Sequence, residues 1–164
     1  LALLSGVLQR FSTRHPAPLR PVPISLREPN DRNGIHTLLG PLGVPFEDHP
    51  QTLPEVLAHV GGCRLLLSGS YHAAVFALSQ GVPVVAVANS PHYQQKLDGL
   101  ARQFGHEGCC VIPLSEPHAV ARLEAAMEKL WHHSPALRPG LLACAKQQIQ
   151  AGQRAYQSLP LPRA

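Results

Sequence analysis

Residues 65–96, LLLSGSYHAAVFALSQGVPVVAVANSPHYQQK, contain two apolar segments that each end in a short polar turn. The first segment, 64–67, fits a short strand, and the continuous apolar character of 82–88 is typical of a strand covered on both faces. A helical pattern follows each turn, over 71–80 and over 90–104. Successive strand–helix units predict a parallel sheet with helices on both faces.

The flanking segments extend this alternation. Apolar residues at helical spacing predict helices, and short apolar runs predict further strands. Asp31 is expected to cap a helix, and Thr52 with Glu55 has the spacing of a capping box. We therefore predict an α/β fold, a Rossmann-like three-layer α/β/α domain over residues 1–157 with 158–164 as a flexible tail. The additional predicted helices are 1–14, 31–39, 52–60, 117–131 and 135–156, and the additional strands are 22–26, 44–46 and 109–112.

Composition narrows the class of protein. The 164 residues are 45% hydrophobic and 15% charged, enough apolar material for one domain with a real core. The formal net charge is +4, and the 14 lysines and arginines are scattered along the chain. They form no basic run and have no aromatic residues interleaved with them, so a nucleic-acid partner is not expected. Anionic small molecules and a membrane surface both remain compatible with this charge.

The four cysteines, Cys63, Cys109, Cys110 and Cys144, form no CxxC pair and are expected to be free thiols in a reducing compartment. No apolar stretch reaches the roughly 18 residues of a membrane span. The N-terminal residues lack the features of a signal peptide and look like the middle of a helix. We therefore expect the chain to be a fragment of a longer protein.

The turn after the first strand offers an anion site. Ser68, Gly69 and Ser70 precede a helix start, where a glycine allows close approach and unpaired N–H groups attract negative charge. His72 follows in the first helical turn. The simpler alternative is that the serines only cap the helix and that His72 has no special role.

The next strand end repeats the arrangement. Asn89, Ser90 and His92 occupy the turn, and Lys96 follows within two turns of the helix. Because the carboxyl ends of parallel strands share one edge of a sheet, we expect both turns to face one cationic crevice. A solvated surface lysine is the alternative for Lys96. The pair His132–His133 has no partner ligands in the sequence and is expected to lie on the surface.

The segment SGSYHAAVFALSQGVPVVAV, followed by the KLDGL run and a later Phe-Gly, resembles the C-terminal half of the polysaccharide pyruvyl transferase family. Members show Ser/Gly-x-Arg-x-His-A-x-x-x-A, then G-V-P-V-V, then a lysine ahead of Gly-Leu. The resemblance is concentrated in residues 63–105. It implies a GT-B-like arrangement of two Rossmann-like halves, of which this chain would be the second, with the N-terminal half absent.

The resemblance also implies the chemistry. The family transfers a pyruvate ketal from phosphoenolpyruvate to sugar hydroxyls, and by this likeness His72 is the general acid and Lys96 binds the donor anion. Ser70 stands where the family has arginine, and a serine cannot supply that charge. Arg27 or Arg64 could compensate. Otherwise the donor has changed or the activity is lost.

The expected partners are phosphoenolpyruvate and a glycan or lipid-linked sugar acceptor, with no cofactor besides the donor. The expected location is the cytoplasm, at the inner face of the membrane, and the isolated fragment is expected to be inactive. Two alternatives stay open: a GT-B glycosyltransferase that uses a nucleotide sugar, and a catalytically degenerate binding domain of the same fold.

Overall fold

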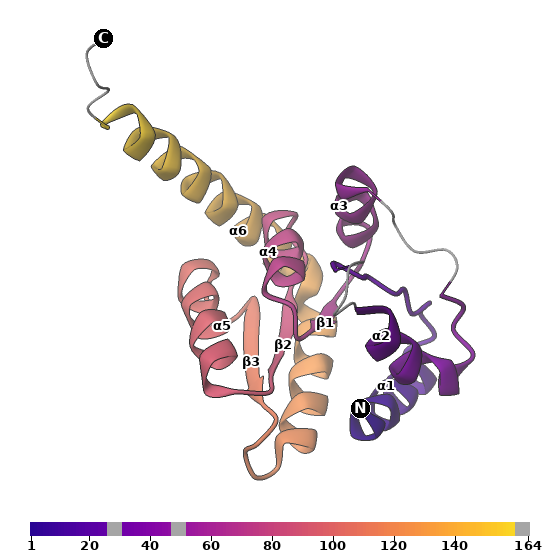
Figure 1. Ribbon diagram of the computed structural model, residues 1–164. Coiled ribbons are helices and arrows are strands. Elements are labelled where there is room, and N and C mark those ends of the chain that lie inside the picture. The colour runs from indigo at the N-terminus through magenta and orange to yellow at the C-terminus, as the bar shows by residue number, and fades with distance from the viewer. Residues whose placement is uncertain (26–30, 47–51, 160–164) are drawn as a thin grey trace.

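The computed structural model of the chain describes residues 1–25, 31–46 and 52–159 (Figure 1). Its centre is a parallel sheet of β1 (Leu66–Ser68), β2 (Val84–Ala88) and β3 (Cys109–Pro113), in the order β1-β2-β3. Leu66 pairs with Val84, and Val84 pairs with Cys109 on the other side. The three strands predicted at 64–67, 82–88 and 109–112 are therefore confirmed, with small shifts of their ends.

Alternate residues of β2 face opposite layers. Val84, Ala86 and Ala88 join the core beneath α3 (Leu53–Gly61), α4 (Tyr71–Ser79) and α5 (Pro91–Phe104). Val85 and Val87 join the core formed with α1 (Ala2–Arg14) and the first half of α6 (Ala119–Gln157). Because side chains alternate along a strand, a strand that is buried on both faces must be apolar throughout. The expected Rossmann-like three-layer α/β/α fold is confirmed.

The C-terminal helix differs from the prediction of two helices. α6 is a single helix through Pro135 and Pro139. A proline has no N–H, so the carbonyl of Trp131, four residues before Pro135, loses its helical hydrogen bond. That carbonyl instead accepts from Arg64 Nε at 3.0 Å and from the Ser134 hydroxyl at 3.1 Å. In Figure 1 the helix bends, and its yellow C-terminal half projects beyond the α/β layers.

The strands predicted at 22–26 and 44–46 are wrong in their described parts. The backbone N–H groups of Ile24 and Ser25 donate to the Asp31 carboxylate, both at 2.8 Å, instead of to a neighbouring strand. Asp31 is itself the first residue of α2 (Asp31–Leu39). Residue 26 lies outside the described residues, as do 160–164 of the predicted tail.

Val44 follows η1 (Gly40–Leu42), a turn of 3-10 helix, and donates to the Leu39 carbonyl at 3.4 Å, so this segment closes α2. The capping box at the start of α3 is confirmed, because Thr52 and Glu55 exchange both hydrogen bonds. Within the described ranges no helix is long and apolar enough to cross a membrane.

Candidate functional site at the carboxyl edge of the sheet

The carboxyl ends of the three strands lie at one edge of the sheet, and the starts of α4 and α5 open there (Figure 1). The first turn packs on the second strand, since a Cβ added to Gly69 would lie 3.5 Å from the Val87 carbonyl oxygen. The third strand follows closely, and Leu114 donates to the Ala88 carbonyl at 2.8 Å. The predicted convergence of strand ends is therefore present in the backbone.

The serines of the first turn have local hydrogen-bonding roles. The Ser68 hydroxyl accepts from the Ser70 N–H at 3.0 Å, and the Ser70 hydroxyl caps α4 by accepting from the Ala73 N–H at 3.4 Å. Both hydroxyls can still donate their own proton to a ligand. The capping alternative and the anion-binding prediction are thus compatible for these two residues.

The second turn is built in the same way. The Ser90 hydroxyl accepts from the Tyr93 N–H at 3.4 Å, with Pro91 in the first position of α5. Asn89 and His92 are exposed beside it. Each of these two helix starts directs its first N–H groups and the positive end of its dipole at the same edge, which favours a bound anion.

The ionisable side chains lie on the open surface of this edge. His72 is exposed in the first turn of α4, with its ring 5.9 Å from the ring of Tyr71. Lys96 is exposed on α5, with Nζ 5.8 Å from the centroid of the Tyr93 ring. In the part of the chain that the structure describes, no hydrogen bond, ion pair or ring contact joins His72 to His92 or to Lys96.

A groove of about 220 Å³ lies elsewhere, between α4, α5 and α6. Its lining is largely apolar and includes Tyr71, Leu100, Phe104 and Ile149. The groove begins near the start of α4 at Tyr71, but neither His72 nor Lys96 lines it. Its chemistry suits an apolar group and does not suit a phosphorylated donor.

Arg64 does not compensate for the arginine missing at position 70. It precedes β1 at the opposite end of the strand from Ser68, and its guanidinium stacks 4.4 Å from the centroid of the Trp131 ring. Its Nε–H donates hydrogen bonds to the Trp131 carbonyl and to the Ser134 hydroxyl oxygen of α6. The other candidate, Arg27, lies outside the described residues.

A model of the polysaccharide pyruvyl transferase family matches residues 7–91, slightly more than half of the chain. The chain belongs to the polysaccharide pyruvyl transferase family. Searches of curated proteins and of solved structures find no match. The family match runs from α1 through β2 and includes the first polar turn with His72 and the start of the second, Asn89 and Ser90, whereas His92 and Lys96 lie beyond its end.

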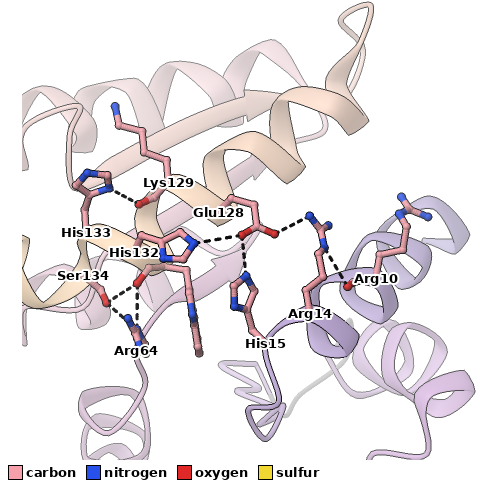
Figure 2. Close-up of polar contacts among 10 residues, drawn as sticks. Arg10, Arg14, His15, Arg64, Glu128, Lys129, His132, His133 and Ser134 are labelled. Atoms are coloured by element: carbon pink, nitrogen blue, oxygen red, sulfur yellow. Dashed lines mark hydrogen bonds and ion pairs between the residues drawn. The ribbon is translucent and has the colours of Figure 1, made fainter.

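This pyruvyl transferase family member has a second polar cluster, which was not predicted from the sequence. His15, at the end of α1, and His132, on α6, both approach the Glu128 carboxylate (Figure 2). The expectation that His132 has no partner is therefore wrong. The spacing of four between Glu128 and His132 was a usable signal, because it places both on one face of a helix. His15 lies 113 residues from Glu128, and no local pattern relates them.

Proposed function

We propose that this protein is a pyruvyl transferase that converts phosphoenolpyruvate and two hydroxyls of a sugar into a pyruvate ketal during the synthesis of a cell-surface glycan. The observation that carries the proposal is the family match over residues 7–91, which includes the SGSYH turn. The fold supports it, because that turn lies at the carboxyl edge of a parallel sheet, where α/β proteins bind ligands.

The reaction needs a proton at the methylene carbon of phosphoenolpyruvate. An acid protonates that carbon, the first sugar oxygen bonds to the neighbouring carbon, phosphate leaves, and the second sugar oxygen takes its place. One hydroxyl proton thus ends on the new methyl group and the other on phosphate. His72 is our candidate acid, since an imidazole exchanges protons near neutral pH and this one is accessible at the first turn of α4.

Donor binding needs groups that neutralise a carboxylate and a phosphate. The turn of Ser68, Gly69 and Ser70 offers hydroxyls and a helix start, and Asn89 and Ser90 offer a second set. Lys96 would supply a mobile positive charge, together with His92 when protonated. This placement is supported by the shared edge and the shared direction of α4 and α5.

The edge is open, and a GT-B-like enzyme closes such an edge with a second Rossmann-like half. We propose that the complete site has this second wall and that the present chain alone does not turn over. The reaction would take place in the cytoplasm beside the membrane that holds the acceptor. Four free cysteines are compatible with that reducing compartment.

Isothermal titration calorimetry of the chain with phosphoenolpyruvate tests the donor assignment. We expect phosphoenolpyruvate to bind and nucleotide sugars not to bind, with Lys96→Ala weakening donor binding about tenfold through loss of one charge. Lys146→Ala is the matched control, because Lys146 is also an exposed lysine but lies on α6. Binding of a nucleotide sugar without phosphoenolpyruvate would instead establish a glycosyltransferase.

The role of His72 is tested in the longest natural form of the protein. His72→Ala should abolish ketal formation from phosphoenolpyruvate, whereas His106→Ala, an exposed histidine after the far end of α5, should leave it unchanged. Turnover that survives the first substitution removes His72 from the mechanism.

A catalytically degenerate domain is the second candidate, favoured by Ser70 in the place of the family arginine. Under that hypothesis the natural protein is inactive and Ser70→Arg creates or raises donor binding. The substitution also removes the cap of α4, which costs about 1 kcal/mol of stability, so binding has to be measured well below the unfolding temperature.

A further inference from the structure

Three side chains that ligate metals meet between α1 and α6. His15 Nε2 lies 2.7 Å from Glu128 Oε2, and His132 Nε2 lies 3.7 Å from the same oxygen. The ligand atoms of the three residues all lie within 4.8 Å of one another. Figure 2 shows both imidazole rings directed at one side of the carboxylate.

The surroundings hold this geometry in place. The ring of His15 packs against the rings of Phe11 and Trp131, with centroid separations of 4.7 Å and 5.2 Å. This packing limits the rotation of the imidazole. Arg14 forms an ion pair with the other carboxylate oxygen, Oε1, at 2.8 Å and leaves Oε2 to the two histidines. Well-built metal sites have such a second layer, in which partners of the ligands fix their orientation.

We propose that His15, Glu128 and His132 bind one divalent cation of the zinc class. Two imidazoles and one carboxylate are a ligand set that zinc accepts, at bond lengths of about 2.0–2.2 Å. Tetrahedral ligands at those lengths are separated by about 3.3–3.5 Å. The separations of 2.7 and 3.7 Å from Glu128 Oε2 lie on either side of that range, and all three ligand atoms lie within 4.8 Å of one another, so a tetrahedral set requires the side chains to shift.

The ion would tie two helices together. His15 follows α1, whereas Glu128 and His132 belong to α6, so the ion would link segments that cover the same face of the sheet. The side chain of His132 is 63% exposed, which leaves a fourth position open to water or to a ligand from another molecule. The site is separate from the carboxyl-edge residues and does not depend on the function proposed for them.

Competition with protons follows from the ligand set. Zinc needs the imidazole nitrogens without their protons, so protons compete with the ion for both histidines. Without the ion, His15 stays hydrogen-bonded to Glu128 Oε2 and Arg14 stays paired with Glu128 Oε1. The cluster therefore keeps α1 in contact with α6 in the absence of metal.

The experiment is a titration of the chain with zinc at neutral pH against a chromophoric chelator. We expect one saturable site, and His132→Gln and His15→Gln should each weaken zinc binding more than about tenfold. His133→Gln is the matched control, because His133 is the exposed neighbour of His132 and bonds only to the Lys129 carbonyl in the described structure. His132 is exposed, so loss of folding does not explain the effect of its variant.

Two further measurements test whether His15, Glu128 and His132 are the zinc ligands. Zinc should raise the thermal unfolding temperature of the wild type and of His133→Gln, but not of His132→Gln. Cobalt in place of zinc should show visible bands of nitrogen and oxygen ligands without thiolate charge transfer. Absence of saturable zinc binding, unchanged affinity in His132→Gln, or a thiolate band from one of the cysteines would each overturn the proposal.

Discussion

Gly81 connects α4 to β2 with a backbone φ of +77°, a conformation that side chains disfavour. A Cβ at this position would lie 2.8 Å from Arg138 Cγ and 3.1 Å from the Arg138 carbonyl oxygen on α6. Gly81 therefore has two roles: it adopts the backbone conformation of the turn, and it leaves room for α6 to pack against that turn.

Gly81→Ala should lower the free energy of unfolding by about 2–4 kcal/mol, as backbone strain adds to steric overlap. Urea denaturation measures the change. Gly43→Ala is the control, since Gly43 has a φ of +67° and no atom within 4 Å of the added Cβ, so only the strain of about 1–2 kcal/mol applies. Equal losses in the two variants would show that the contact with α6 is unimportant.

Cys109 lies in β3 and is completely buried. Burial raises the pKa of its thiol from 9.0 to about 12, with smaller contributions from Cys110 and Asp98. The thiol thus stays protonated in the folded chain while the unfolded chain ionises. Its contribution to stability is complete below pH 9 and is lost between pH 9 and pH 12.

The free energy of unfolding should fall above pH 9 by up to about 1.4 kcal/mol per pH unit on account of this thiol. Cys109→Ala should show a shallower decline in urea denaturation series between about pH 8 and pH 11. The comparison uses slopes, so the fixed cost of the smaller side chain cancels. Parallel slopes in the two proteins would contradict the prediction.

At the scale of elements, α6 shows how a proline can be accommodated within a helix. The Trp131 carbonyl, deprived of its partner by Pro135, accepts from Arg64, and the guanidinium also stacks on the Trp131 ring. Arg64 lies 67 residues away along the chain. A local rule ends the helix before Pro135, whereas a tertiary hydrogen bond allows it to continue.

Arg64→Ala should destabilise the protein by about 1–3 kcal/mol, because a charged donor and a cation–π contact are lost. In the Pro135→Ala background, where residue 135 regains an N–H for the Trp131 carbonyl, that cost should shrink by about 1 kcal/mol. A double-mutant cycle in urea measures the coupling. Pro139→Ala provides the control background, since the carbonyl four residues before it belongs to residue 135, and there the cost should be unchanged.

The described part of the molecule has two hydrophobic cores, one on each face of the sheet, and α6 contributes to both. Its first half packs on the face with α1, and Leu141 reaches the core beneath α4 and α5. All described residues from Lys146 to Leu159 are exposed. Stability should therefore depend on the inner part of this helix and very little on the projecting end.

Removal of residues 150–164 should change the free energy of unfolding by less than about 0.5 kcal/mol, since no buried side chain is lost from the described part. Leu141→Ala should instead cost about 2–5 kcal/mol. Urea denaturation of both variants measures this contrast. A truncation as damaging as Leu141→Ala would mean that the projecting end packs against the core in solution.

The candidate site was predictable only where its pattern is local. The serines at 68, 70 and 90 stand at strand–helix junctions that the sequence identifies, and Ser70 and Ser90 cap α4 and α5 in the structure. The mutual placement of His72 and Lys96 depends on how α4 and α5 lie on the sheet, which no spacing along the chain states. A polar residue just after a strand can be assigned to the carboxyl edge of the sheet. Its position in the sequence does not show which other side chains it contacts there.

Local patterns in the sequence predicted the order of the main strands and helices, the capped starts of α3, α4 and α5, and the family. Hydrophobic period and capping act within a few residues, so they can be read locally. No local pattern predicts that α6 continues through Pro135 or that His15 meets Glu128. Both depend on pairs 67 and 113 residues apart, which only the packing of helices on the sheet brings together.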